Sequence, residues 1–330
     1  MSAGTQPQLS AILATPDSYA TIARTITFLC AQTAADQIEL VVVARDASTL
    51  GEAPQGLDAL HSVRVVECPR ASTLVQARGA GIRAASAPVV VLAEDHSCPE
   101  PEWAHALITA HESDCVAVGP MIANANPASA MSWAQIFLTY GRFVEPANGG
   151  RCDDVPGHNS SYKRDVLLAY GERLDAMLEI EYFMHCDLHQ RGYQLIVEPR
   201  AITRHLNKSR LHAFVQDHMV HGRIFASVRH ENLSFVRRWF LAATLPFTIP
   251  QRMIWSLREI LQPQRRMLCP LLRILPCVLF GVFVRCWGEM IGLCSGSGDA
   301  KQQLWDIEFR RERGLTSQDL ANLELSRNAH

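Results

Sequence analysis

The chain has 330 residues, enough to bury a large core in one big domain or two smaller ones. It is 48% hydrophobic and 19% charged, with a formal net charge of −2. These values exclude a disordered chain, and the overall charge gives no support to nucleic-acid binding.

Apolar strands and amphipathic helices alternate along the first part of the chain. Strands are predicted at 9–13, 39–43, 63–66, 89–92 and 115–118, and helices at 19–32, 74–85 and 103–111. Such alternation implies right-handed β-α-β crossovers and a mostly parallel sheet. The sequence therefore predicts an α/β fold, Rossmann-like, with helices flanking the sheet.

The pattern changes beyond Gly119. Helices are predicted at 131–144, 163–170 and 180–190, a polar loop at 147–157, and two short strands at 194–198 and 201–205 on either side of Pro199. From Leu211 onward the chain is predominantly helical by its spacing. We therefore expect an α/β domain over 1–210 and a helical extension over 211–330.

The buried strand 89–92 leads directly into the ionisable residues Glu94, Asp95 and His96. In open α/β sheets, ligands bind beyond the carboxyl ends of the strands. Glu94 and His96 are one residue apart, so both can point at one centre, which suggests a divalent cation holding an anionic substrate. A solvated turn accounts for the same three residues, and the segment alone favours neither interpretation.

Two further features have alternative explanations. Glu179 and Glu181 lie near the start of a predicted helix, where the macrodipole tolerates acids without any functional role. His205 follows a short strand, as Glu94 to His96 do, although a lone histidine is also common in a core. The glycines in 79–84 match a dinucleotide-binding pattern, but a helix precedes them instead of a strand, so this match is accidental.

The order and spacing of segments from Ser10 to His205 resemble family-2 glycosyltransferases with the GT-A fold. The segments that carry this likeness are Ser10–Thr15, Arg24–Thr33, Glu39–Val43, Ala77–Ile82, Glu94–His96 with Pro101–Trp103, Gly157–Arg164, Glu181 before Gly192 and Tyr193, and His205. The segment Trp287–Gly292 is similar to membrane-associated bacterial members of the family.

The resemblance implies a nucleotide-sugar donor, a glycan or lipid-linked acceptor and a bound Mn²⁺ or Mg²⁺. It implies a metal site of Asp95, His96 and His205, with Glu94 nearby. It assigns the donor site to Thr15, Asp46, Arg78, Glu94 and Asp95, and the acceptor side to His158 and Asn159. Glu181 is expected to be the catalytic base, with Glu179 in reserve, and a single displacement by that base inverts the anomeric carbon.

The chain departs from the family pattern at several positions. Gly79 replaces an asparagine of the family element, and Ala44 and Arg45 stand where the family has two aspartates. Asp46 follows one residue later and is expected to take over the contact with the nucleotide base. The metal motif contains Glu and His where Asp is usual, and the catalytic carboxylate belongs to a glutamate where the family usually has an aspartate. These exchanges affect which donor is used more than which reaction is catalysed.

The region 200–285 is both basic and apolar, with only three acids among many arginines. Its apolar runs, 239–249 and 274–284, are shorter than the roughly 20 residues that a spanning helix needs, and Pro276 interrupts the second. We expect an interfacial or re-entrant membrane attachment. The alternatives are a buried helical core, an oligomer contact, or a single kinked membrane span.

The N-terminal residues Met1–Gln8 lack the pattern of a signal peptide, and the ten cysteines form no C-x-x-C pair. We therefore expect a reduced compartment and a peripheral position on the cytoplasmic face of the cell membrane.

Three other functions remain open from the sequence. A non-catalytic nucleotide-sugar-binding protein is suggested by Ala44 and Arg45. A nucleotidyltransferase would also use a metal at a sheet edge, but it needs a glycine-rich basic loop that residues 14–19 do not provide. A membrane-bound scaffold rests on the basic tail alone and leaves the acids after strand 89–92 unexplained.

Overall fold

The structure is a computed structural model that describes residues 6–69, 73–261 and 268–327. The chain divides into two compact units. Unit 1 consists of Met1–Ala123 and Glu145–His205, and unit 2 consists of Asn124–Val144 and Leu206–His330. Each unit is described by itself.

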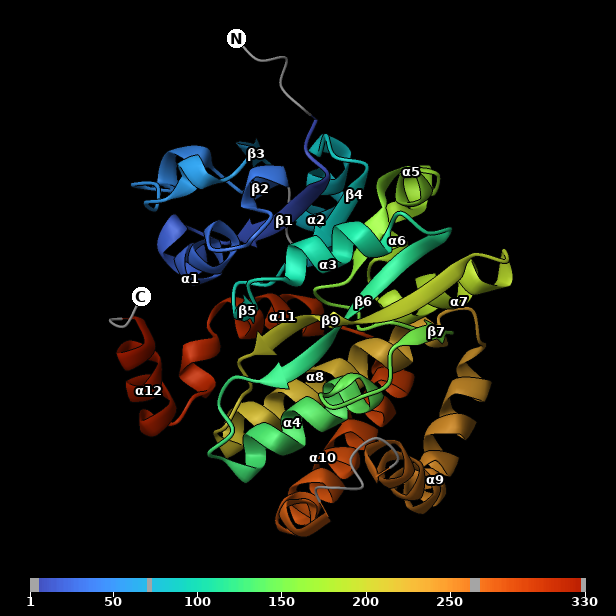
Figure 1. Ribbon diagram of the computed structural model, residues 1–330. Helices are drawn as coiled ribbons and strands as arrows, with labels where there is room; N and C mark the ends of the chain where they lie inside the picture. Colours follow the sequence, from blue (N-terminus) through green and yellow to red (C-terminus); the bar gives the residue numbers. More distant parts are fainter. Residues whose placement is uncertain (1–5, 70–72, 262–267, 328–330) are drawn as a thin grey trace. The chain divides into compact units, whose positions relative to one another are not determined.

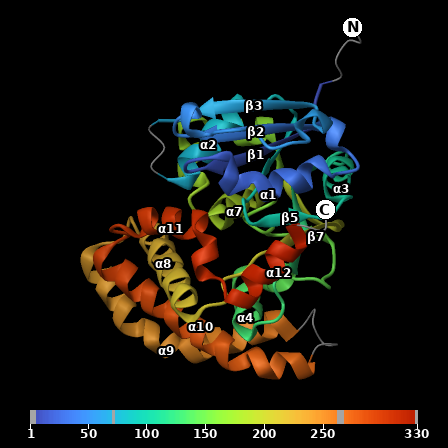
Figure 2. The same cartoon turned by 90° about the vertical axis from the view of Figure 1, so that its left-hand side faces the viewer.

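Unit 1 is built on a mixed sheet, which has nine strands among the described residues (Figure 1). They are β1 (Leu9–Thr15), β2 (Ile38–Ala44), β3 (Ser62–Glu67), β4 (Val89–Leu92), β5 (Ser97–Pro99), β6 (Cys115–Asn124), β7 (Gly150–Cys152), β8 (Ser161–Lys163) and β9 (Gln194–His205). The strand order is β3-β2-β1-β4-β8-β6-β9-β5, and β7 pairs with β9. Figure 2 shows β3, β2 and β1 side by side.

The pairing direction changes across this sheet. Strands β3, β2, β1 and β4 pair in parallel, so their carboxyl ends meet at one edge. β8 is antiparallel to both β4 and β6, and β9 is antiparallel to β5 and β7. The predicted α/β class with helices flanking the sheet is confirmed.

The helical segments of unit 1 connect these strands. They are α1 (Tyr19–Cys30), η1 (Ala35–Gln37), η2 (Ala47–Thr49), η3 (Leu57–Ala59), α2 (Leu74–Ala84), α3 (Trp103–Ala110), α5 (Arg164–Leu168), η5 (Gly171–Arg173), α6 (Leu174–Met177) and α7 (Glu181–Gln190). Every residue of β1 and β2 is buried, and since successive side chains point to opposite faces of a sheet, both faces of these two strands are covered. On one face, Ile26 of α1 belongs to the same core as Leu13 of β1.

On the other face, α2 approaches the sheet closely at Gly81. A Cβ at this position would lie 2.4 Å from Cγ2 of Ile12 and 3.0 Å from Cγ2 of Val43. The glycine therefore serves helix–sheet packing, and α2 already begins at Leu74, as expected for an accidental match to the dinucleotide pattern.

Several sequence predictions were wrong in detail. β9 runs unbroken through Pro199, which lies between the residues paired with β7 and those paired with β5, so its missing N–H interrupts neither ladder. The predicted polar loop 147–157 contains β7, and the helix expected at 163–170 spans only Arg164–Leu168. The helix expected at 131–144 ends at Tyr140 and is followed by a 3-10 turn.

Unit 2 is helical. It contains α4 (Ala130–Tyr140), η4 (Gly141–Phe143), α8 (Leu211–Arg229), α9 (Phe235–Leu261), α10 (Leu268–Ser295), α11 (Ala300–Phe309), η7 (Arg311–Gly314) and α12 (Ser317–Arg327). α8 and α10 pack with close backbone contact at glycines. A Cβ on Gly222 would lie 2.2 Å from the Arg285 carbonyl oxygen, and one on Gly288 would lie 2.2 Å from that of Met219.

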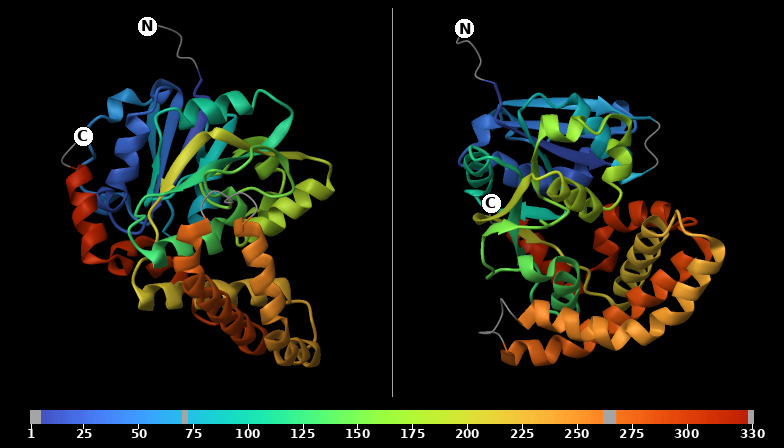
Figure 3. Two further views of the ribbon diagram at one scale, coloured as in Figure 1. Left: turned by 60° about the horizontal axis from the view of Figure 1, so that its bottom comes forward. Right: turned by 90° about the vertical axis from the view of Figure 1, so that its right-hand side faces the viewer.

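The apolar runs 239–249 and 274–284 lie within two long helices of unit 2. α9 continues through Pro246 and Pro250, and α10 continues through Pro276. By length and composition alone, the segment Leu271–Ser295 of α10 is long and apolar enough to cross a membrane, and 44% of its most apolar window is buried in the structure. In Figure 3 the orange α9 and the redder α10 run side by side.

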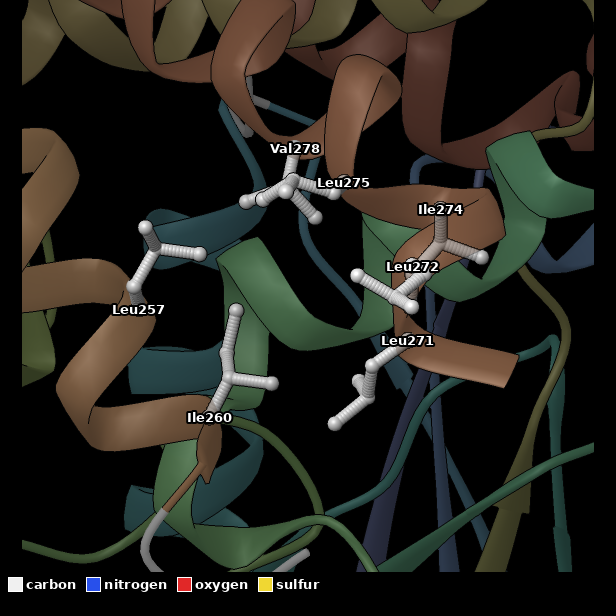
Figure 4. Close-up of a pocket in the computed structure, with 7 residues that line it drawn as sticks. All are labelled: Leu257, Ile260, Leu271, Leu272, Ile274, Leu275 and Val278. Carbon is white, nitrogen blue, oxygen red and sulfur yellow. The ribbon is translucent and has the colours of Figure 1, made fainter. Parts of the chain in front are cut away.

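An apolar groove of about 410 Å³ lies between the end of α9 and the start of α10. Figure 4 shows its lining, which consists of Leu257, Ile260, Leu271, Leu272, Ile274, Leu275 and Val278.

Candidate active site

The site of unit 1 lies beyond the carboxyl end of β4. Glu94 and His96 follow this strand, and each is only 5% exposed. β5 begins directly after them and pairs antiparallel with the end of β9, in a register that places Ser97 opposite His205. This pairing brings His205, 109 residues away in the chain, against His96.

Glu94, His96 and His205 form a compact triangle of potential metal ligands. The two Nε2 atoms of His96 and His205 are 3.1 Å apart, and Oε2 of Glu94 lies 3.4 and 3.5 Å from them. Ligands held about 2.1 Å from one cation are separated by about 3.0 Å in octahedral and about 3.4 Å in tetrahedral geometry. The three atoms therefore have the spacing of ligands around a single divalent cation.

Asp95 lies behind His96. Nδ1 of His96 is 2.6 Å from Oδ1 of Asp95, so the carboxylate accepts a hydrogen bond from that nitrogen. This contact fixes the tautomer in which Nε2 is the ligand atom, an arrangement typical of metal-binding histidines. The predicted ligand set of Asp95, His96 and His205 shares its two histidines with the observed triangle.

Glu94 is held from two directions. Asn159 Nδ2 donates to Oε2 of Glu94 at 2.9 Å and to Oγ of Ser97 at 2.8 Å, and Thr25 Oγ1 donates to the Glu94 carbonyl oxygen at 2.8 Å. Asn159 is 2% exposed and has a φ of 60°, in the left-handed region. A non-glycine residue keeps this conformation only where its surroundings enforce it, and such residues cluster at functional sites.

Glu181, the first residue of α7, lies in the same network. Arg78 of α2 donates to it from Nη1 at 2.9 Å and to Nδ1 of His158 from Nη2 at 2.7 Å. Nδ1 of His158 lies 3.3 Å from Oε1 of Glu94 and 3.7 Å from Oε1 of Glu181. The imidazole of His158 therefore lies between the triangle and Glu181. Arg78 itself is only 3% exposed.

Both carboxylates of this network are ionised at neutral pH. Burial raises the pKa of Glu181, but the neighbouring His158 and Arg78 lower it by more, so it lies below its usual value. Burial also raises the pKa of Glu94, and His158, His96 and His205 together bring it well below the usual value. An ionised, nearly buried Glu181 is in the form that a general base requires.

Residues 10–171 match the sequence model of glycosyl transferase family 2. The chain carries a family-2 glycosyltransferase domain. A crystal structure of GalNAc-T7 with UDP, GalNAc and Mn²⁺ is similar over 61% of this chain, with 16% identity and a TM-score of 0.43. This chain spans 44% of the length of that GalNAc-T7 chain. No curated protein matches the sequence.

In this glycosyltransferase domain, the packing of α2 explains one departure from the family pattern, the glycine at position 79. A Cβ on Gly79 would lie 2.1 Å from Oδ1 of Asp175, which pairs with Nη2 of Arg83 at 2.8 Å. The place of the family's asparagine side chain is thus taken by a contact between α2 and α6. Gly157 also allows a close approach, since a Cβ there would lie 3.0 Å from Oε2 of Glu181.

The other predicted residues of the glycosyltransferase lie at the same sheet edge or near α7. Thr15 ends β1, where its Oγ1 donates to the Ser18 carbonyl oxygen at the start of α1. Asp46 follows β2, is exposed, and accepts from Ser48, which lowers its pKa. Glu179 lies between α6 and α7. Their predicted roles remain predictions.

Sequence reasoning missed residues that support the site. Thr25 and Ser97 donate hydrogen bonds to Glu94 and so hold the turn around it. His185 of α7 is hydrogen-bonded to both Tyr162 and Asp154. Their contacts join segments that are distant in the chain, and no local spacing indicates them.

A second group in unit 2 has metal-like spacing, formed by Asp217, His221 and Glu308. Here the ammonium of Lys208 contacts Asp217 and lies 3.4 Å from Oε1 of Glu308, and Lys208 is 1% exposed. Because Lys208 pairs with both acids and Arg311 also pairs with Glu308, we interpret the group as a structural ion-pair network.

Proposed function

We propose that this glycosyltransferase moves a sugar from a nucleotide-sugar donor to an acceptor hydroxyl, with metal dependence and with inversion of the anomeric carbon. The observation that supports this most is the joining of the Glu94–His96–His205 triangle to Glu181 through His158. We assign catalysis to residues 1–210 and a helical accessory role to 211–330.

The triangle would hold Mn²⁺ or Mg²⁺. When bound, the cation supplies electrostatic stabilisation of the charge that develops on the departing nucleoside diphosphate. Two nitrogen ligands favour Mn²⁺, because Mg²⁺ prefers oxygen and water. Asn159 orients the carboxylate of Glu94, and Asp95 orients the imidazole of His96.

Glu181 is our candidate for the general base. It accepts the proton of the acceptor hydroxyl as that oxygen bonds to the anomeric carbon and the bond to the diphosphate oxygen breaks. One displacement of this kind inverts the carbon. Arg78 holds the Glu181 carboxylate in place, and His158 lies where it can contact the acceptor or the donor sugar.

The donor and its metal requirement can be tested together. A panel of sugar nucleotides is screened by thermal shift, with Mn²⁺ and with EDTA, on the full chain. We expect one donor to raise the melting temperature only when the metal is present. An equal shift in EDTA would contradict metal-dependent donor binding, and no shift with any sugar nucleotide would contradict the proposed donor class.

We also propose that α9 and α10 attach the enzyme to an anionic membrane surface, on the cytoplasmic face, next to a lipid-linked or other glycan acceptor. Large apolar side chains of these helices are exposed: Phe235, Val236, Trp239, Phe240, Phe247, Ile254, Trp255, Leu272, Phe280, Phe283 and Trp287. The exposed fraction reaches 85% at Phe247. Exposed arginines such as Arg258 and Arg273 accompany them, a combination that suits the headgroup level.

A further inference from the structure

A buried chain of three side chains lies next to Glu181 in unit 1. Nδ1 of His185 is 2.6 Å from Oδ1 of Asp154, and Nε2 of His185 is 2.9 Å from the hydroxyl of Tyr162. A carboxylate accepts hydrogen bonds, so Nδ1 of His185 donates to Asp154 and Nε2 accepts from Tyr162. None of these three residues has a role in the catalysis proposed for Glu181 and the Glu94–His96–His205 triangle.

The chain connects the elements that carry the site. Asp154 and Tyr162 lie at the two ends of one loop, and this loop contains His158 and Asn159. The single imidazole of His185 therefore fixes both ends of the loop. Because Tyr162 also lies in β8, which pairs with β4, the loop is tied to the strand that leads to Glu94.

His185 is also one helical turn beyond Glu181. Residues four apart lie on the same face of a helix, so the imidazole anchors the face of α7 that presents the Glu181 carboxylate. His185 is 0% exposed and Tyr162 is 1% exposed. With so little exposure, neither side chain can contact a substrate, and any effect on catalysis has to act through other residues.

We propose that His185, together with Asp154 and Tyr162, is a positioning residue for catalysis: it holds the loop that carries His158 and Asn159 in register with the helix that carries Glu181. The inference rests on the proposed role of Glu181. A base that is displaced by about 1 Å can lose on the order of 10²-fold in rate, so small shifts in this register have large effects.

The experiment compares variants of the full chain in which one hydrogen bond of His185 is removed, as in Tyr162→Phe, or weakened by loss of the acceptor's charge, as in Asp154→Asn. Tyr162→Phe keeps the ring and removes the hydroxyl, and Asp154→Asn removes the carboxylate at the partly exposed end of the chain. Ser161→Ala is the matched control, because Ser161 is the neighbouring buried residue of β8 and its hydroxyl contacts His111 instead. Rates and KM values are measured with the donor found by thermal shift.

We expect Tyr162→Phe and Asp154→Asn each to lower kcat by roughly tenfold or more with little change in donor KM. Ser161→Ala should keep the wild-type kcat. Because both changes act through one imidazole, the double variant should lose less than the product of the two single losses. A folded Tyr162→Phe with wild-type kcat would overturn the proposal, as would fully multiplicative losses in the double variant.

The proposed base Glu181 and the proposed positioning role of His185 are contradicted by different results. Wild-type turnover in Glu181→Gln would overturn the proposed base. An inactive Glu181→Gln combined with a fully active Tyr162→Phe and Asp154→Asn would leave the base in place and overturn only the positioning role of His185. Near-ultraviolet circular dichroism and the melting temperature identify a variant that lost activity by unfolding. If one of Tyr162→Phe and Asp154→Asn is unfolded, the kcat of the other tests the positioning role.

Discussion

At the scale of single residues, the site depends on side chains that fix one another. Hydrogen bonds from Asn159 and Ser97 orient the Glu94 carboxylate, and three neighbouring histidines lower its pKa. It is therefore ionised and held in place, as a metal ligand must be. The sequence pointed to Glu94 and His96 by their position after a strand, and to Glu181 through the resemblance to family-2 glycosyltransferases. It did not indicate the pair of Arg78 and Glu181, because those residues are 103 positions apart.

Asn159 can be tested without disturbing the backbone. Glycine accepts a φ of 60° and has no side-chain amide, so Asn159→Gly removes the hydrogen bonds to Glu94 and Ser97 and leaves the backbone conformation in place. We expect Mn²⁺ binding, followed by electron paramagnetic resonance, to weaken by roughly 10–100-fold, as is common when a residue behind a ligand is lost.

The control for this experiment is His221→Ala, in the second acidic group of unit 2. It should leave the amount of bound Mn²⁺ unchanged, because Lys208 already neutralises that group. Unaltered Mn²⁺ binding in Asn159→Gly, or a lost ion in His221→Ala, would contradict the assignment of the metal to the triangle in unit 1.

His111 should make the stability of the protein depend on pH. Burial, aided by Lys163, lowers its pKa from 6.5 to about 4. The unfolded chain therefore binds a proton between these values that the folded chain does not, and stability falls as pH drops through this window. The expected loss between pH 7 and pH 5 is about 2 kcal/mol.

Urea unfolding at the two pH values measures this effect. The variant His111→Gln has no group that titrates here, so its stability should change by less than that of the wild type over the same interval. An equal change in both proteins would show that His111 is not the group responsible.

At the scale of elements, segments with an apolar pattern of their own were predictable, and segments that form only by pairing with distant strands were not. β4 has the predicted limits, and α7 begins one residue later than expected. β5 and β8 have three residues each and exist because they pair with distant strands. His205 lies in β9 and is brought to the site because β9 pairs with the short strand β5. Its partners could therefore not be deduced from local spacing.

The contact between α8 and α10 gives a prediction at this scale. In an open helix, Gly→Ala stabilises by up to about 1 kcal/mol through helix propensity. At Gly288 the added Cβ would lie 2.2 Å from the Met219 carbonyl oxygen, so the helices must separate. We expect Gly288→Ala to lower the unfolding free energy by about 1–3 kcal/mol in urea titrations.

The exposed Ser295 at the end of the same helix provides the control. Ser295→Ala should be neutral or slightly stabilising. If Gly288→Ala were stabilising to the same degree, the two helices would not be in the close contact described.

At the scale of the whole molecule, the family match and the proposed site do not coincide. The match covers residues 10–171, which include Arg78, Glu94 and His158, but Glu181 and His205 lie beyond it. Their roles therefore rest on the geometry of unit 1. Nine of the ten cysteines are free thiols in the structure.

The apolar face of α9 should decide membrane attachment. Phe240, Phe247 and Trp255 are exposed by 67%, 85% and 62%, so replacing all three with serine removes apolar surface without opening the core. We expect sedimentation with vesicles that contain anionic lipid to fall sharply, and wild-type binding to weaken as salt is added. Val65→Ser, at an exposed apolar residue of β3, is the control. Unchanged sedimentation of the triple variant would contradict the proposed membrane surface.

The most direct test of the account is the transfer rate of Glu181→Gln, measured beside Glu179→Gln with the donor and metal identified by thermal shift. The account predicts that Glu181→Gln loses transfer by roughly 10²–10⁴-fold while its donor affinity in Mn²⁺ stays that of the wild type. Retained transfer in Glu181→Gln, or a loss confined to Glu179→Gln, would contradict it.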